Sequence, residues 1–474
     1  MNRQITEYIR RIDEMTKHSD NSDVREEYDL VIIGAGLSGI TAAKEAVKKS
    51  IKTALIEKNK IGGSYYNYGF IPFRTLGRES EKFRVIKDFN IKPDTDIYEK
   101  ISEKIHKNIY ESLFRNSYSS LKNNGIDLFS GSAYFSGENT VMVGKNEIKF
   151  KKAIIATGTT DFIPPVKGLE KYLTVKDIYT IENFPDKILI LGAGPLGCQT
   201  AQIFSNLGVK VFLVEKEKNI LNNFESKYSN YVRDELIKNN VSVYTGTEII
   251  KIEKEKNIFL SNGKNYDVDE IIICCGKTPD IYDFLPDNAG IEYDIKKGIK
   301  IDEYLKTTNK NIYCAGDISS EIKNNANAVI SAKVAFKNAF SVKKQKITDI
   351  TIPFCIYTKP QIASVGITDK LKYNFTEYDL SENDKMLFED INDGIIEIYT
   401  ENGGKRILGV FTVADKAEEI ADLFSVIIEN KTEFDNFDNI VISYPSYIND
   451  IKDNKNFKKE KNTLKEKLFR INKK

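Results

Sequence analysis

Two glycine-rich turns, far apart in the chain, constrain the fold more than any other feature of the sequence. Both read Gly-x-Gly-x-x-Gly, at residues 34–39 and 192–197. Each follows a short apolar run, residues 28–33 and 187–191, and each precedes a stretch with helical spacing. A strand, a glycine turn and a helix predict the start of a β-α-β unit, so the chain contains two such units.

An acidic residue occupies the same place in both units. Glu57 ends the next predicted strand of the first unit (residues 53–57), and Glu215 ends that of the second (residues 210–215). Each lies 23 positions after the first glycine of its turn. One such turn alone is a weak signal, but two with a matched carboxylate predict two dinucleotide sites. The glycines permit the tight bend, the approach of a pyrophosphate and close helix packing, and the carboxylate is placed for ribose hydroxyls.

Length and charge limit the remaining possibilities. A chain of 474 residues is too long for one hydrophobic core, so we expect about three domains. Its 70 basic and 69 acidic residues give no global reason to bind nucleic acid or an anionic membrane. No apolar run reaches the roughly 18 residues of a membrane span, and residues 1–28 lack the apolar core of a signal peptide. We therefore expect a cytoplasmic protein.

The cysteines do not predict redox or metal chemistry. They form no Cys-x-x-Cys pair, and Cys274 and Cys275 would point to opposite faces of a strand. With His18 and His106 as the only histidines, no zinc-ligand cluster is visible. We interpret the cysteines as small buried apolar residues. They are Cys198, Cys274, Cys275, Cys314 and Cys355.

The rest of the chain gives weaker signals. Residues 1–27 form a polar extension that is partly helical around residues 5–15. Residues 352–368 are strand-like, residues 404–413 suggest a hairpin and residues 416–430 have helical spacing. The Lys- and Asn-rich residues 452–474 predict a solvated tail or a terminal helix.

Five further segments resemble the pyridine-nucleotide-disulfide oxidoreductases, the family of dihydrolipoamide dehydrogenase and glutathione reductase. They are residues 57–63, 155–158, 275–279, 312–317 and 358–366, in the family's order and with its approximate spacing. The resemblance spans about residues 28–455. It implies an α/β protein with two Rossmann-like nucleotide-binding domains and a C-terminal α+β dimerisation domain, as in glutathione reductase.

The resemblance also implies domain bounds and partners. The predicted bounds are an N-terminal extension (1–27), an FAD-binding domain in two parts (28–168 and 299–345), an NAD(P)-binding domain between them (169–298), a dimerisation domain (346–455) and a basic tail (456–474). A homodimer that binds small-molecule nucleotides is implied.

The cofactor residues follow by motif. For FAD they are Gly34, Gly36, Gly39 and Glu57 on the ADP half, Gly63 and Ser64 near the pyrophosphate, Gly158, and Asp317 on the ribityl chain. For NAD(P)H they are Gly192, Gly194, Gly197, Glu215 and Gly276. Glu215 favours NADH, because a carboxylate repels the 2′-phosphate of NADPH.

This sequence differs from the family at the positions of its catalytic residues. The two redox cysteines are replaced by Tyr65 and Phe70, and the C-terminal catalytic His by Tyr444. Asn449 stands where the orienting Glu would be. Without nucleophile, partner thiol and base, we expect no disulfide reduction. The aromatic residues either pack only, or form a site where a substrate stacks.

One branch of the family, the soluble si-specific pyridine-nucleotide transhydrogenases, has a similar pattern, including Tyr-Pro in place of His-Pro. The resemblance implies that one nicotinamide gives hydride to flavin and a second removes it. Arg74 and Gln199, in place of a Lys–Glu pair near the flavin, and Tyr444 are the candidate catalytic residues. Two alternatives stay open. One is an NADH diaphorase or oxidase that passes electrons to a quinone, oxygen or a partner protein, and the other is a retired enzyme that acts as an FAD/NAD sensor or assembly subunit.

Overall fold

The computed structural model describes residues 3–17, 27–89, 97–181, 185–253, 257–281, 283–319, 323–389, 393–401, 404–437, 440–452 and 457–458. The chain divides into two compact units, which are treated separately below. Unit 1 comprises Met1–Lys218 and Asn240–Asp349, and unit 2 comprises Asn219–Asn239 and Ile350–Lys474.

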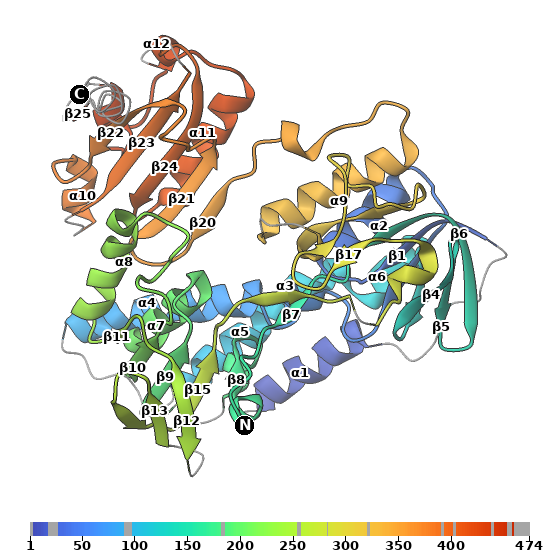
Figure 1. Ribbon diagram of the computed structural model, residues 1–474, viewed down its shortest axis with the longest axis horizontal. Coiled ribbons are helices and arrows are strands. Elements are labelled where there is room, and N and C mark those ends of the chain that lie inside the picture. The colour runs from blue at the N-terminus through green and yellow to red at the C-terminus, as the bar shows by residue number, and fades with distance from the viewer. Residues whose placement is uncertain are drawn as a thin grey trace, which may run out of the picture. The chain divides into compact units, whose positions relative to one another are not determined.

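Unit 1 contains a seven-stranded sheet built around the first glycine turn. Its order is β3-β2-β1-β6-β5-β4, with β19 paired to β6. Strands β1, β4, β5 and β6 of this sheet are labelled in Figure 1. The strands are β1 (Tyr28–Ile33), β2 (Thr53–Glu57), β3 (Asp127–Ser130), β4 (Ala133–Gly137), β5 (Thr140–Val143), β6 (Asn146–Ile155) and β19 (Ile312–Cys314). The central strands are parallel and buried on both faces, which explains their continuous apolar runs. Helices α2 (Leu37–Lys48) and α9 (Asn325–Phe340) pack together beside this sheet.

A second, parallel sheet in unit 1 carries the second glycine turn. Its order is β11-β10-β9-β15-β8. The strands are β8 (Leu173–Thr174), β9 (Lys187–Leu191), β10 (Lys210–Val214), β11 (Ser242–Tyr244) and β15 (Glu270–Ile273). The turn after β9 leads into α7 (Pro195–Asn206), so both predicted β-α-β units are confirmed.

Smaller elements complete unit 1. The helices are α1 (Arg3–Thr16), α3 (Gly63–Asn67), α4 (Phe70–Asp88), α5 (Ile97–Leu113) and α6 (Tyr118–Asn123). The antiparallel strands are β7 (Thr159–Asp161) with β16 (Lys277–Pro279), β12 (Ile249–Glu253) with β13 (Asn257–Leu260) and β14 (Asn265–Asp267), and β17 (Tyr293–Asp294) with β18 (Gly298–Ile299). The helix predicted within the N-terminal extension is confirmed as α1, and α1 packs on α5.

Unit 2 is an antiparallel sheet covered by helices, in the order β20-β21-β24-β23-β22-β25. The strands are β20 (Phe354–Ile356), β21 (Gln361–Gly366), β22 (Asn374–Asp379), β23 (Ile395–Thr400), β24 (Ile407–Ala414) and β25 (Phe457–Lys458). The helices are α8 (Ser226–Lys238), α10 (Asp384–Phe388), α11 (Ala417–Glu429), α12 (Phe434–Phe437) and α13 (Asn449–Lys452). The predicted strands and helix of this region are confirmed as β20, β21 and α11. The hairpin predicted at residues 404–413 is wrong: Ile407–Ala414 form the single strand β24, because they pair with β23 on one side and β21 on the other. Helix α11 packs against β21 and β24. Most of the predicted tail lies outside the described residues; Lys452 ends α13 and β25 pairs with β22.

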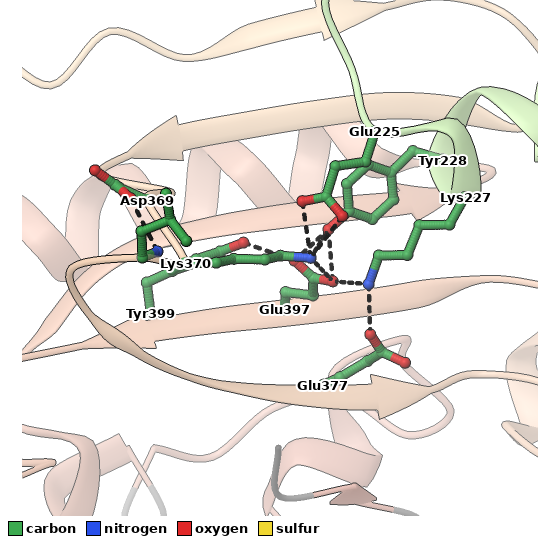
Figure 2. Close-up of polar contacts among 9 residues, drawn as sticks. Glu225, Lys227, Tyr228, Asp369, Lys370, Glu377, Glu397 and Tyr399 are labelled. Carbon is green, nitrogen blue, oxygen red and sulfur yellow. Dashed lines mark hydrogen bonds and ion pairs between the residues drawn. The ribbon is translucent and has the colours of Figure 1, made fainter. Parts of the chain in front are cut away.

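A buried carboxylate holds α8 to the sheet of unit 2. In sequence order, α8 comes between β10 and β11, which belong to unit 1. The fully buried Glu397 accepts hydrogen bonds from the hydroxyls of Tyr228 and Tyr399 at 2.6 and 2.7 Å (Figure 2). It pairs with the ammonium groups of Lys227 and Lys370 at 2.6 and 3.0 Å. Burial raises the pKa of Glu397, but these hydrogen bonds outweigh it and hold the pKa below its ordinary value. The ionised carboxylate is therefore the centre of the α8 attachment.

Candidate nucleotide-binding sites and the aromatic cluster

The first glycine turn is too crowded for side chains at two of its three glycines. Gly34 has a φ of 101°, and a Cβ there would lie 2.4 Å from the carbonyl oxygen of Ala156. A Cβ on Gly39 would lie 1.8 Å from the carbonyl oxygen of Gly34. No described atom lies within 4 Å of a Cβ built on Gly36, so the middle of the turn is open. This is the shape that a pyrophosphate needs at a helix N-terminus.

The second turn repeats this geometry. Gly192 has a φ of 99°, and a Cβ there would lie 2.6 Å from the carbonyl oxygen of Cys274. A Cβ on Gly197 would again lie 1.8 Å from the carbonyl of the first glycine, while Gly194 again faces open space. The two turns therefore have the same closed and open positions, and both fit a dinucleotide.

The two matched carboxylates brace their own turns. One oxygen of Glu57 accepts from the backbone N–H of Ala35 at 2.7 Å and the other from Asn59 at 2.8 Å. Burial raises the pKa of Glu57, and these two hydrogen bonds oppose that rise. Glu215 accepts from the second residue of its turn in the same way. Each oxygen has a second lone pair, so the predicted ribose contacts remain compatible with this arrangement.

A loop after β2 lies directly against the first turn. The backbone N–H of Gly62 donates to the carbonyl of Ala35 at 2.8 Å, and a Cβ on Gly63 would lie 2.8 Å from Cα of Gly36. Ser64 follows, exposed, at the start of α3. The structure thus brings Gly63 to the open middle of the turn, where the sequence predicts the pyrophosphate.

Asp317 provides an independent test of the fit to FAD. A Cβ on the preceding Gly316 would lie 2.4 Å from Oγ of Ser38, in the first turn of α2. The Oδ1 atom of Asp317 is buried and has no hydrogen-bond partner among the described residues. Burial raises the pKa of Asp317 to about 6. A buried carboxylate oxygen requires a donor, and a ribityl hydroxyl beside the first turn would supply one.

Gly158 and Gly276 flank the small ladder formed by β7 and β16. Both have positive φ values, 72° and 106°. The carbonyl of Gly158 accepts from the backbone N–H of Asp280 at 3.1 Å, and the carbonyl of Gly276 accepts from Phe162 at 3.0 Å. The two glycines therefore shape the crossings after β6 and β15, and their cofactor contacts remain predictions.

Aromatic rings pack together at positions 65 and 70, where the resemblance places the redox cysteines of the family. The rings of Tyr65 and Phe70 are stacked, with centroids 5.4 Å apart and planes 8° apart, and Tyr66 meets Tyr65 edge-on at 4.7 Å. The amide of Asn116 donates to the Tyr66 hydroxyl at 3.0 Å and accepts from Nζ of Lys44 at 2.6 Å. Burial raises the pKa of both tyrosines. No sequence motif pointed to Asn116, which lies 50 positions from Tyr66.

The three candidate catalytic residues lie on different elements. Arg74 is on α4 and Gln199 on α7, and these helices pack so that Asn206 donates to Ser80 at 3.4 Å. Both candidates lie two turns before that contact on their own helices. The buried Gln199 side chain donates to the carbonyl of Pro195 at 2.9 Å within its own helix.

Tyr444, the third candidate, belongs to unit 2. Its side chain is 71% exposed, and its hydroxyl hydrogen-bonds the carboxylate of Asp384. Nearby, Asn449 accepts from the backbone N–H of Ser446 at 2.5 Å. The Asn449 side chain therefore shapes its own turn.

The cysteines behave as the composition predicts. All five are free; three are buried and two partly buried. Burial raises the pKa of Cys274 and of Cys275 to about 12, so neither thiol ionises near neutral pH. Within the described ranges there is no group of three or more His, Cys, Asp or Glu residues that could hold a metal ion. Among the helices described, none is long and apolar enough to cross a membrane.

Comparison with protein families gives two matches. The family model described as pyridine nucleotide-disulphide oxidoreductase matches residues 28–336, and the model of its dimerisation domain matches residues 352–454. Together they cover most of the described chain.

Individual relatives and structures agree with these matches. A mercuric reductase from Bacillus cereus is 27% identical over 425 residues, covering 85% of this chain and 67% of its own. A soluble pyridine nucleotide transhydrogenase from Ectopseudomonas mendocina is 27% identical over 452 residues, covering 88% and 95%. The structure of a HOCl-induced flavoprotein disulfide reductase, RclA from Escherichia coli, superimposes with a TM-score of 0.80 at 21% identity, covering 90% and 99%. The predicted fold is thereby confirmed.

Proposed function

Because the chain belongs to the pyridine nucleotide-disulphide oxidoreductase family, we propose that it is an FAD-dependent NAD(P)H oxidoreductase that works without a redox dithiol. The proposed reaction moves a hydride from one nicotinamide nucleotide to another. The observation that carries the proposal is the stacked pair of Tyr65 and Phe70 in the place of the two cysteines. The transhydrogenase relative, which matches over 88% of this chain, supports the same assignment.

The residues that would hold the cofactors come from the two turns. Members of the family bind FAD and NAD(P)H, and FAD supplies an acceptor and donor of hydride when bound. The first turn, the loop at Gly63 and Asp317 would hold FAD, because they combine an open phosphate position with a buried oxygen that lacks a donor. The second turn would hold NAD(P)H, with Glu215 favouring NADH through its negative charge.

The aromatic cluster of Tyr65, Tyr66 and Phe70 indicates what the protein itself contributes to the proposed reaction. Tyr65 and Phe70 carry no thiol that could attack or form a disulfide, so the chain offers no protein nucleophile at this place. Their stacked rings fill the volume there. Tyr66, fixed by Asn116, supports the edge of the stack. The protein's proposed contribution is therefore orientation rather than covalent catalysis.

Arg74 is proposed as a charged contributor beside the cofactor. It occupies the place of a Lys in related dehydrogenases, while the uncharged Gln199 occupies that of the Glu. A guanidinium stays charged at all physiological pH values and would stabilise negative charge that develops near it. Tyr444 is proposed to act from the dimerisation unit of a homodimer, for which the matched dimerisation domain is the support.

Anaerobic rapid mixing tests the proposal. NADH should bleach the flavin absorbance, and the reduced protein should then transfer hydride to thio-NAD⁺. Glutathione disulfide and lipoamide should not be reduced. The variant Gly192→Ala serves as the control, because its methyl group would collide with the carbonyl of Cys274 and close the second turn. It should retain FAD but lose bleaching by NADH.

Three results would contradict the proposal. Turnover of a disulfide at a rate comparable with hydride exchange would show a dithiol-independent reductase. Bleaching by NADH followed by electron transfer only to oxygen or a quinone would identify a diaphorase. Bound flavin that NADH never reduces would identify a nucleotide sensor.

A further inference from the structure

Helix α1 is an integral part of unit 1, held by one apolar face. Ile5, Ile12 and Thr16 are buried, at positions that share this face. The helix packs on α5 (Figure 1). The rings of Tyr8 and Tyr110 lie 5.8 Å apart at this contact. A short isolated helix of 14 residues would be only marginally stable in water, so this packing is what keeps α1 folded.

The C-terminal end of α1 is joined to the loop that follows β2. The carbonyl of Thr16 accepts a hydrogen bond from the backbone N–H of Ile61 at 3.1 Å. One residue earlier in the loop, Nζ of Lys60 pairs with Oδ1 of Asp13 at 2.8 Å. The last carbonyls of a helix have no partner within it, so Ile61 completes the end of α1 while α1 fixes the loop. Both Thr16 and Ile61 are fully buried.

The same loop is joined on its other side to the first glycine turn. Ile61 is followed by Gly62, which donates to Ala35, and by Gly63, which lies against Gly36. The side chain of Asn67 holds the carbonyls of Ile61 and Gly63 from within, at 2.9 and 3.0 Å. Two hydrogen bonds, from Ile61 to Thr16 and from Gly62 to Ala35, therefore connect the end of α1 to the first glycine turn.

We propose that α1 is a clasp on the flavin site: it holds residues 60–63 against the first glycine turn and thereby slows the release of FAD. Asp13 and Lys60 are its positioning residues, and the Thr16 carbonyl is its backbone contact. Movement of residues 60–63 away from Gly36 would open the first glycine turn, against which they lie. Undocking α1 removes both the ion pair and the hydrogen bond that oppose this movement.

The chain offers a matched pair of lysine variants for the test. Lys60 and Lys17 both pair with Asp13, at 2.8 Å each, but Lys17 belongs to the α1 end itself and Lys60 to the loop. FAD release is measured by the recovery of flavin fluorescence when the holoprotein is diluted. We expect Lys60→Ala to speed release severalfold and Lys17→Ala to leave it within twofold.

A stronger variant, Ile12→Asp, places a charge in the buried face of α1. Limited trypsin digestion at Arg10 and Arg11 reports whether the helix has undocked. We expect a release rate at least tenfold higher, with little change in the unfolding temperature of the FAD-free protein. An undocked α1 with a wild-type release rate would overturn the proposal, as would equal effects of Lys60→Ala and Lys17→Ala. The clasp rests on the proposed placement of FAD at the first turn. Its readout needs no electron acceptor, so its failure is distinguishable from failure of the proposed reaction.

Discussion

The carboxylate of Glu215 accepts a hydrogen bond from the backbone N–H of Ala193 at 2.6 Å, as that of Glu57 does from Ala35 at 2.7 Å. In each of the two β-α-β units, the acidic residue at the end of the second strand fixes the glycine turn that follows the first strand. The internal repeat is therefore preserved in the hydrogen bonding as well as in the spacing. The repeat gives both turns the geometry that a phosphate needs at a helix N-terminus.

This repeat predicts opposite ligand losses for two equivalent substitutions. Glu215→Ala should weaken NADH binding about tenfold or more while FAD content stays normal, because a charged hydrogen bond contributes about 1.5–3 kcal/mol. Glu57→Ala should instead lower FAD content. Each variant is the control for the other, measured by flavin absorbance and NADH titration. Loss of both ligands in both variants would show that the turns are not independent.

Asp317 predicts a pH-dependent stability of the FAD-free protein. Its pKa is raised from 3.8 to about 6 in the folded state, so the folded protein binds more protons than the unfolded chain between these values. Stability must then fall as the pH rises through that window, by at most about 3 kcal/mol. Asp317→Asn should remove this part of the pH dependence in denaturant titrations. Identical pH profiles for the two proteins would contradict the raised pKa.

The stacked rings predict an energetic coupling. A double-mutant cycle of Tyr65→Leu and Phe70→Leu should give a coupling of about 1 kcal/mol in unfolding free energy, because stacked aromatic pairs contribute about 0.5–1.5 kcal/mol beyond their burial. The chain contains no tryptophan, so circular dichroism is the suitable measurement. Strictly additive effects would mean that the two rings are independent space fillers.

The attachment of α8 predicts a large effect of one carboxylate. Glu397→Ala should destabilise unit 2 by about 3–5 kcal/mol, because it removes the buried centre of an ion-pair network. The hydroxyls of Tyr228 and Tyr399 lose their acceptor, and the two lysines keep only the less buried carboxylates of Glu377 and Glu225. Glu377→Ala is the matched control. That carboxylate also pairs with Lys227 but is partly exposed, so its loss should cost about 1 kcal/mol or less.

Glu397 also fixes the direction of the pH effect. Its pKa is lowered, so its contribution is present above the ordinary value of 4.5 and is lost as the pH falls through the lower folded-state pKa. Wild-type protein and Glu397→Ala should therefore converge in stability in acid. Equal losses for the Glu397 and Glu377 variants at neutral pH would contradict the central role of Glu397.

The sequence by itself determined the local structural features of this protein. Glycine turns, their carboxylates and the apolar runs of β1, β2, β9 and β10 depend on backbone conformation and on neighbours close in the chain, so residue type and spacing are sufficient to predict them. The replacement of two cysteines by Tyr65 and Phe70 was likewise visible from the sequence. These features fixed the family resemblance and the two predicted nucleotide sites.

Only the tertiary structure decided which distant groups meet. Asn116 contacts Tyr66 across 50 positions, Thr16 meets Ile61 across 45, and α8 joins the C-terminal sheet through a carboxylate more than 150 positions away. Such contacts are selected by the packing of whole elements, and an Asn, a backbone carbonyl or a buried Glu carries no mark of its partner in the local sequence. The physical reason is that contacts between distant residues depend on how whole helices and strands pack. Turns and strands depend mainly on the residues next to them in the chain.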